Sequence, residues 1–246
     1  MMLKQIAEIN FPTRWANFRL MAFEAQWTNG KASTKKRETA LALVLGDIHS
    51  FPPLVRVHSE CMTGEVFHSL RCDCHDQLQL ALRAIAREGA GVLVYEKQEG
   101  RGIGLMEKLR AYELQDQGLD TVDANLRLGH AVDLRDYAVA VQILQFLEIR
   151  SLRLISNNPE KIRAVASSGI HIVERVAADV PRNPHSSRYL ATKRDRLGHL
   201  SNAAVDAFVS DDRWAGGTQQ ADICGESDCS ENEAGAGMRG DLWQIS

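Results

Sequence analysis

Three cysteines in the segment 58–74 are the residues of this chain best suited to metal chemistry. The segment reads HSECMTGEVFHSLRCDC, and Cys61, Cys72 and Cys74 have the spacing C-x10-C-x-C. A structural zinc site is usually closed by four protein ligands, whereas a catalytic zinc keeps three and leaves the fourth position for water. Zinc can lower the pKa of that water to roughly 7. The spacing therefore predicts a hydrolytic enzyme with one catalytic zinc ion.

A closed structural zinc site is the main alternative, in which His58, His68 or His75 would supply a fourth ligand. A nucleobase deaminase fits less well. The tripeptide 58–60, His-Ser-Glu, matches the H-x-E half of the deaminase pattern. The P-C-x-x-C half is missing, because the cysteine pair here is C-x-C without a preceding proline.

Composition indicates an ordinary globular protein. The chain has 246 residues, of which 44% are hydrophobic and 25% are charged. Its N-terminus, MMLKQIAEINF, contains no apolar run of signal-peptide length, and no stretch approaches a membrane span. We therefore expect a cytoplasmic protein, in which thiols stay reduced and clustered cysteines bind metal instead of forming disulfides.

Charge is distributed unevenly along the chain. Residues 205–246 carry nine acidic and two basic residues, so the formal net charge of −3 leaves the rest of the chain at +4. A mildly basic body suits a phosphorylated small molecule, but it is far less basic than a nucleic-acid binder. We expect one catalytic domain over residues 1–202 and a disordered acidic tail over 203–246, where Cys224 and Cys229 are incidental thiols.

Hydrophobic patterning predicts an α/β fold with a mixed sheet and flanking helices. The first fifty residues are typical of short strands separated by loops. Further strands are predicted at 54–60, 91–96, 151–156 and 171–176, and helices at 76–88, about 105–116, about 134–147 and 159–167.

Two segments have features of anion sites. The glycine-rich stretch QEGRGIG (98–104) follows a predicted strand, and its backbone amides can approach an anion closely, although a tight turn alone also explains it. Asn158 and Pro159 suit a helix cap and first helical position, so that helix start and Lys161 either hold an anion or form a plain cap. Asp133 and Arg135 are separated by one residue, so they are not neighbours on a helix face.

Taken together, these segments resemble the GTP cyclohydrolase II family, which catalyses the first committed step of riboflavin synthesis. The resemblance runs in order over about residues 3–201 and leaves the acidic tail outside. It is carried by RVHSEC (56–61), LRCDC (70–74), QEGRGIGL (98–105), Asp133 with Arg135, and Asn157-Asn158-Pro159 with Lys161.

The resemblance implies a reaction and its cofactors. GTP is opened at its imidazole ring, C8 leaves as formate, and pyrophosphate is released. The product is 2,5-diamino-6-(5-phosphoribosylamino)pyrimidin-4(3H)-one. Zinc at the three cysteines would deliver water to C8, magnesium would serve the phosphates, and the chain would form a homodimer.

The resemblance also implies roles for single residues. Tyr112 would assist ring opening and Asp133 would accept a proton. Arg135 would attack the α-phosphate or, because a guanidinium stays protonated in proteins, would instead clamp the phosphoryl group. The GTP contacts would be Arg56, Val57, His58, Ser59, Glu60, Gln77, Glu99, Gly100, Arg101, Thr121, Ser156 and Lys161.

Three positions depart from the usual family pattern. His75 replaces a glycine, and we expect it to point to solvent instead of binding zinc. Ser156 often is threonine, so a hydroxyl is retained. The segment 126–130, LRLGH, also differs. Two alternatives to the complete reaction therefore stay open, a variant cyclohydrolase that releases a formamide intermediate and a non-catalytic zinc-stabilised GTP-binding module.

Overall fold

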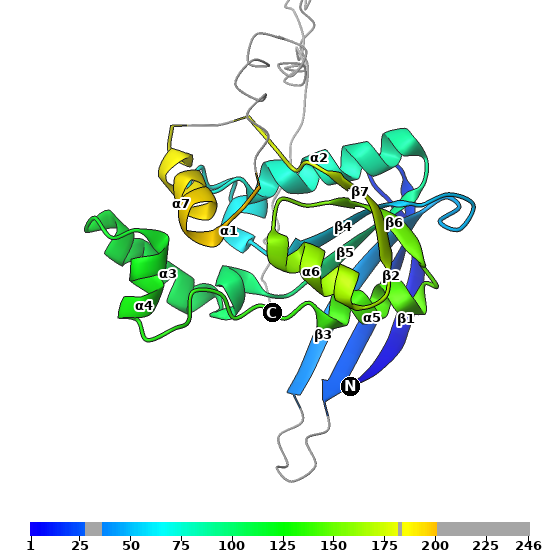
Figure 1. The fold of residues 1–246 in the computed structure, drawn as a ribbon, viewed down its shortest axis with the longest axis horizontal. Coiled ribbons are helices and arrows are strands. Elements are labelled where there is room, and N and C mark those ends of the chain that lie inside the picture. Colours follow the sequence, from blue (N-terminus) through cyan, green and yellow to red (C-terminus); the bar gives the residue numbers. More distant parts are fainter. Residues whose placement is uncertain (28–35, 182–183, 201–246) are drawn as a thin grey trace, which may run out of the picture. The chain divides into compact units, whose positions relative to one another are not determined.

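The computed structural model describes residues 1–27, 36–181 and 184–200, and these form a seven-stranded mixed sheet with flanking helices (Figure 1). The α/β fold class expected from the sequence is confirmed. The predicted acidic tail over 203–246, with Cys224 and Cys229, lies outside the described residues. Within the described residues, no helix combines the length and the apolar sequence that crossing a bilayer requires.

The sheet order is β1-β2-β3-β5-β4-β6-β7. The strands are β1 (Met2–Pro12), β2 (Asn17–Trp27), β3 (Lys36–Leu45), β4 (Leu54–Ser59), β5 (Gly91–Glu96), β6 (Ser151–Ile155) and β7 (His171–Val176). The described helices are α1 (Met62–Glu65), α2 (Cys74–Glu88), the 3₁₀ turn η1 (Glu99–Gly102), α3 (Leu105–Asp116), α4 (Thr121–Arg127), α5 (Ala138–Phe146), α6 (Pro159–Ser167) and α7 (Ser187–Leu197).

The N-terminal half of the sheet is antiparallel and longer than the short strands we expected. β1, β2 and β3 span 11, 11 and 10 residues. Along β2, buried residues such as Phe23 and Ala25 alternate with more exposed ones, which is the pattern of a strand with one covered face. That alternation lets the β2–β3 pairing continue from Arg19 to Trp27.

The other half of the sheet is parallel and positions the site. β5 pairs with β4, β4 with β6, and β6 with β7, all in parallel. β4 and β5 are buried almost throughout, as expected for strands covered on both faces. In open α/β sheets, ligands bind beyond the carboxyl ends of parallel strands. The segments after β4, β5 and β6 are therefore the natural place for a site.

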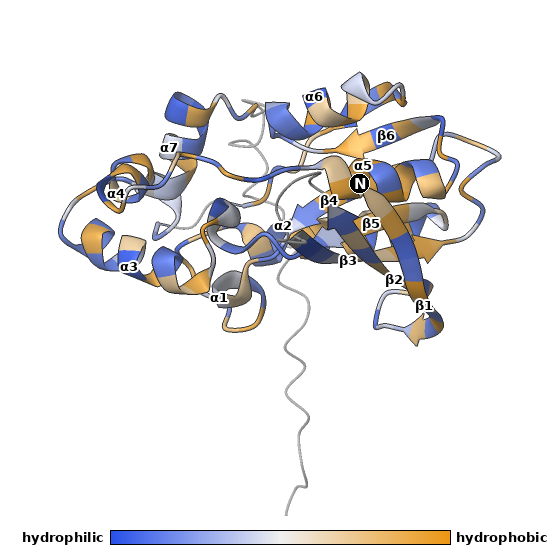
Figure 2. Ribbon diagram, turned by 90° about the horizontal axis from the view of Figure 1, so that it is seen from below, coloured by the Kyte–Doolittle hydropathy of each residue, from blue (hydrophilic) through white to orange (hydrophobic). Residues whose placement is uncertain are grey.

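Helices cover both faces of the sheet. On one face, buried residues of α5, including Ile143 and Leu144, pack with β2 to β6 in the larger core. On the other face, Leu82 and Ile85 of α2 pack against Leu93 of β5. The sequence of α5, AVAVQILQF, is mostly apolar, in keeping with its buried position (Figure 2).

The helix predicted at about 134–147 begins later, at Ala138. Tertiary hydrogen bonds explain the difference. The amide of Leu134 donates to the carbonyl of Arg101 at 3.0 Å, and the amide of Asp136 donates to the side chain of Gln98 at 3.0 Å. The segment 133–136 is thus tied to the glycine-rich turn, so its backbone is not available for a helical turn.

Three helices were not predicted, namely α1, α4 and α7. α1 has only four residues and α4 only seven, so neither shows a helical repeat. α7 has a predominantly polar sequence, SRYLATKRDRL. A helix of this composition gives little periodic signal because it does not bury a broad apolar face.

We expect Ile143→Ala to lower the free energy of unfolding by about 3 kcal/mol, because it leaves a cavity in the larger core. Ile143 is 0% exposed. Denaturant-induced unfolding would measure the loss. Glu113→Ala, at an exposed position of α3, is the control and should change stability by no more than about 0.5 kcal/mol. Equal effects of the two substitutions would contradict the assignment of this core.

Candidate active site

The three predicted zinc ligands converge beside the end of β4. Cys61 precedes α1, Cys72 lies in the following loop, and Cys74 is the first residue of α2. Their Sγ atoms all lie within 4.8 Å of one another, and those of Cys61 and Cys72 are 3.6 Å apart. Tetrahedral zinc with bonds of about 2.3 Å to sulfur separates its sulfur ligands by about 3.8 Å. The cluster therefore fits a zinc ion.

Gly64 of α1 leaves the space that this cluster needs. A Cβ atom at this position would lie 2.8 Å from Sγ of Cys72 and 3.2 Å from Sγ of Cys61. Real Cβ atoms do not approach so closely, so any larger residue would push the sulfurs apart. The backbone thus forms one wall of the candidate metal centre.

In the part of the chain that the structure describes, no histidine nitrogen belongs to the cysteine group. Nε2 of His58 lies 2.9 Å from Oε1 of Glu65. His75, which we expected to face solvent, is half-buried, and its ring centroid lies 4.1 Å from that of His68. The three-ligand arrangement is therefore the one that the geometry favours.

The pKa values of the thiols depend on hydrogen bonds among the three cysteines and on the nearby Lys108 ammonium. Hydrogen bonds from Cys72 and Cys74, together with the Lys108 ammonium, hold the pKa of Cys61 far below its usual range. The hydrogen bond to Cys61 raises the pKa of Cys72 to about 11, since one proton is kept between the two sulfurs. Metal binding needs the thiolate form, which the lowered pKa of Cys61 favours.

Lys108 links the metal centre to the glycine-rich turn. Its Nζ donates to Sγ of Cys61 at 3.1 Å, to Oγ1 of Thr63 at 2.8 Å and to Oε1 of Glu99 at 2.7 Å. The sequence analysis missed this residue. The available signal was its spacing from Tyr112, because residues four apart lie on the same helix face.

A hollow opens beside the cysteines. It unites residues from β4, α2, the glycine-rich turn, α3 and α7 that are far apart in the sequence. Its lining includes these predicted site residues: Ser59, Glu60, Cys61, Cys72, Cys74, Glu99, Gly100, Arg101, Tyr112, Thr121 and Arg135.

A second hollow adjoins the first and shares Ser59, Cys74, Arg101 and Arg135 with it. It adds the predicted residues Arg56, His58, Gln77, Ser156 and Lys161. Of the predicted set, Val57 and Asp133 line neither hollow. The carbonyl of Val57 accepts a hydrogen bond from Nζ of Lys161 at 2.8 Å.

Arg101 lines both hollows with a guanidinium whose terminal nitrogens have no hydrogen-bond partner among the described residues. Gly100 and Arg101 both have φ of 61°, a left-handed conformation that is unusual for a non-glycine residue and strained. Among the described residues, neither terminal nitrogen of the Arg101 guanidinium has a hydrogen-bond partner, although both are buried. Burying an unpaired charge is costly, so this arrangement is suited to receive an anion.

Asp133 and Arg135, which we expected to be separated on a helix, are in direct contact. They lie in a loop, and Nε of Arg135 donates to Oδ1 of Asp133 at 2.9 Å. Although burial opposes both charges, Arg135 lowers the pKa of Asp133, and Asp133 raises the pKa of Arg135. The carboxylate and the guanidinium are therefore both charged, with Arg135 at the wall of both hollows.

Cations dominate the second hollow. Burial lowers the pKa of Arg56 to about 10, and burial together with the Arg56 guanidinium lowers the pKa of Lys161 well below its usual range. Tyr189 and Lys193 of α7 line this hollow as well. Both residues fit the family resemblance, but no site role was predicted for them. An excess of positive charge in a cleft of this kind suits an anionic phosphate group.

We expect Gly64→Ala to lower the affinity for zinc roughly tenfold or more, because its Cβ displaces the sulfur ligands. Chelator competition monitored by metal analysis would measure the change, and circular dichroism would verify the fold. Val66→Ala is the control, since Val66 ends the same short helix and is 64% exposed. Unchanged zinc affinity in Gly64→Ala would argue against a metal at this centre.

The sequence profile of the family described as GTP cyclohydrolase II matches residues 4–177 of this chain. The chain is 48% identical to GTP cyclohydrolase-2 of Escherichia coli O9:H4 (strain HS) over 203 residues, which cover 82% of this chain and 100% of that relative. It is 50% identical to riboflavin biosynthesis protein RibBA of Chlorobium phaeovibrioides over 200 residues, which cover 81% of this chain and 47% of that relative. The chain thus spans about half the length of the Chlorobium protein.

Among solved structures, RibBX, a two-domain 3,4-dihydroxy-2-butanone 4-phosphate synthase from A. baumannii, aligns with a TM-score of 0.40 and 19% identity. The alignment covers 71% of this chain and 40% of that chain. This likeness is too weak to support an argument about function. The profile match and the identity to a relative that is covered over its full length decide the matter, and they confirm that this chain belongs to the GTP cyclohydrolase II family.

Proposed function

We propose that residues 1–202 open the imidazole ring of GTP, release formate and pyrophosphate, and form 2,5-diamino-6-(5-phosphoribosylamino)pyrimidin-4(3H)-one. This reaction is the first step of riboflavin synthesis. The observation that carries the proposal is one cavity that joins a zinc-type thiol cluster to the guanidinium of Arg101, whose terminal nitrogens have no hydrogen-bond partner among the described residues. Family membership supports it.

Cys61, Cys72 and Cys74 would hold the zinc ion. Zinc, when bound through three ligands, supplies a water molecule that is acidic enough to act as a nucleophile near neutral pH. Lys108 donates to the Cys61 sulfur at 3.1 Å and, after the hydrogen bonds from Cys72 and Cys74, contributes to its lowered pKa. We also propose a magnesium ion that is bound together with the substrate phosphates.

Residues of the two hollows would divide the nucleotide between them. Glu99 and Gln77 offer an acceptor and an amide to the base. Arg56, Arg101 and Lys161 would contact the phosphates, because their side chains provide N–H donors in the second hollow. The remaining proposed contacts, from segments that flank the two hollows, are Val57, His58, Ser59, Glu60, Gly100, Thr121 and Ser156.

Tyr112, Asp133 and Arg135 are the proposed catalytic residues. Burial raises the pKa of Tyr112, so its hydroxyl keeps its proton and can donate to a ring nitrogen beside the metal centre. Asp133 is proposed as the proton acceptor from its position in the family pattern, although it lines neither hollow and its contact with Arg135 lowers its pKa. Arg135 is held as a cation by Asp133, which favours a phosphate clamp over a covalent nucleophile.

We expect mass spectrometry to detect formate, pyrophosphate and the diaminopyrimidine monophosphate after the zinc-loaded protein is incubated with GTP and magnesium. Cys72→Ser should retain the fold but abolish ring opening, because it removes one of three zinc ligands. A product that retains the formamide would indicate a variant cyclohydrolase. Unchanged GTP with zinc bound, or outright unfolding of Cys72→Ser, would favour a zinc-stabilised binding module.

We further propose that the chain forms a homodimer. Supporting observations come from the edge strand β1, where Ile6 and Ile9 are 56% and 52% exposed. Apolar residues on an exposed edge strand favour pairing with another chain. Light scattering should give twice the chain mass of 27.3 kDa. Ile6→Lys/Ile9→Lys should shift the mass toward that of one chain, and a native protein that is monomeric at micromolar concentration would refute the proposal.

A further inference from the structure

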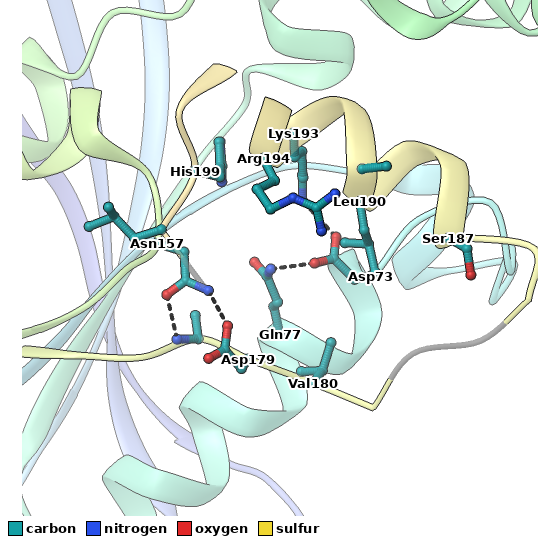
Figure 3. A pocket seen from close by; sticks show the side chains of 13 residues that line it. Asp73, Gln77, Asn157, Asp179, Val180, Ser187, Leu190, Lys193, Arg194 and His199 are labelled. Carbon is teal, nitrogen blue, oxygen red and sulfur yellow. Dashed lines mark hydrogen bonds and ion pairs between the residues drawn. The ribbon is translucent and has the colours of Figure 1, made fainter. Parts of the chain in front are cut away.

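A buried polar chain connects α7 to β4 through the start of α2. Nζ of Lys193 donates to Oδ1 of Asp73 at 2.7 Å, and Nε2 of Gln77 donates to Oδ2 of the same carboxylate at 2.6 Å. Oε1 of Gln77 then accepts from Nη2 of Arg56 at 2.6 Å. Figure 3 shows the Gln77 amide facing Asp73 beside α7.

The side chain of Asp73 makes hydrogen bonds that are unusual for its position in the chain. It is the N-cap of α2, where an aspartate normally accepts a bond from the first helical amides. Here its side chain makes no capping bond, and its two oxygens serve Lys193 and Gln77 instead. The carboxylate is buried and forms an ion pair with the Lys193 ammonium at 2.7 Å. The local sequence favours a capping hydrogen bond from Asp73, but the bonds to Lys193 and Gln77 have replaced it.

The chain of bonds fixes the orientation of the Gln77 amide. An ionised carboxylate only accepts hydrogen bonds and a guanidinium only donates them. With Asp73 on one side and Arg56 on the other, only one of the two flipped amide orientations satisfies both partners. Gln77 lines the second hollow, so these bonds fix which end of its amide is the donor and which the acceptor there.

We propose that Lys193 and Asp73 are positioning residues that orient Gln77 and thereby set the discrimination between purine bases. A 6-oxo-2-amino purine and a 6-amino purine present donors and acceptors in different orders. A flipped amide would lose the match to guanine. This inference rests on the proposed function, in which Gln77 contacts the base.

The test compares KM for GTP with the inhibition constant of ATP, since both nucleotides carry the same triphosphate and differ only in the base. Lys193→Met and Asp73→Asn should each raise KM for GTP about tenfold, as expected for loss of a bond to a charged group. ATP inhibition should change much less, so discrimination falls. We expect kcat to stay within about threefold, because orientation of the base acts mainly on binding.

Arg194→Met is the matched control on the same helix. Arg194 is exposed, and among residues 1–27, 36–181 and 184–200 its ion-pair partner is its neighbour Asp195, so both constants should be unchanged. Zinc content and circular dichroism must be the same in all variants. Equal weakening of GTP and ATP by Lys193→Met would overturn the inference, because it would place the ammonium on the phosphates. An unchanged KM would overturn it as well.

A second measurement does not depend on activity. Asp73→Asn brings an N–H group against the N–H of Gln77, and Gln77→Glu brings a carboxylate against Asp73. The double variant restores a donor facing an acceptor, since the new asparagine can donate to the new glutamate and still accept from Lys193. Each single variant should lower Tm, and the double variant should regain most of the loss.

Additive losses of Tm in the double variant would refute the oriented amide. The two tests also distinguish a failure of the proposed function from a failure of the positioning role. A native chain that leaves GTP unchanged would defeat the proposed function, while the Tm cycle would still report on the Lys193–Asp73–Gln77–Arg56 chain. A native chain that is active, with unaltered base discrimination in the variants, would defeat the positioning role alone.

Discussion

Parallel pairing of β5, β4 and β6 is the constraint on which the site depends. Because parallel strands end at the same edge of a sheet, the segments after residues 59, 96 and 155 emerge side by side. Each segment starts at once with polar residues. The cysteine ligands follow β4, the glycine-rich turn follows β5, and Ser156 follows β6. Sheet topology thus assembles three parts of the site before any side chain makes a specific contact.

The buried charges of the site lower the stability of the folded protein. Arg56 and Lys161 are buried close to other cations, and their pKa values fall because desolvation and mutual repulsion disfavour the charged forms. Arg101 adds a guanidinium without hydrogen-bond partners among the described residues. The large cores on both faces of the sheet supply the stability that offsets this strain. An anionic substrate would relieve it, and this explains why the charges are concentrated there.

Two lysines from helices outside the sheet hold the site together. Lys108 of α3 reaches Cys61 and Glu99, and Lys193 of α7 reaches Asp73, which lies between two of the candidate zinc ligands. Lys108 therefore joins the candidate metal centre directly to Glu99, and Lys193 joins it to Gln77 through Asp73. Residues that contact the metal ligands without binding the metal themselves orient those ligands and tune their charge. Metal centre, base contacts and peripheral helices form one polar network and not three independent parts.

The sequence by itself determined the zinc-type cysteine spacing, the glycine-rich turn and most elements of the α/β fold. These features depend on local pattern, and β5, α3 and α6 have the bounds that the pattern predicts. Only the tertiary structure decided that 133–136 is a loop and that Asp133 contacts Arg135. It also decided that the Asp73 side chain accepts a hydrogen bond from Lys193 instead of capping α2. The segment 133–136 and Asp73 form hydrogen bonds to residues on other elements of the fold. Asp133 and Arg135 can reach each other only because the segment between them is not helical. Hydrogen bonds to such partners outweigh local propensity, and no local pattern of residues records them.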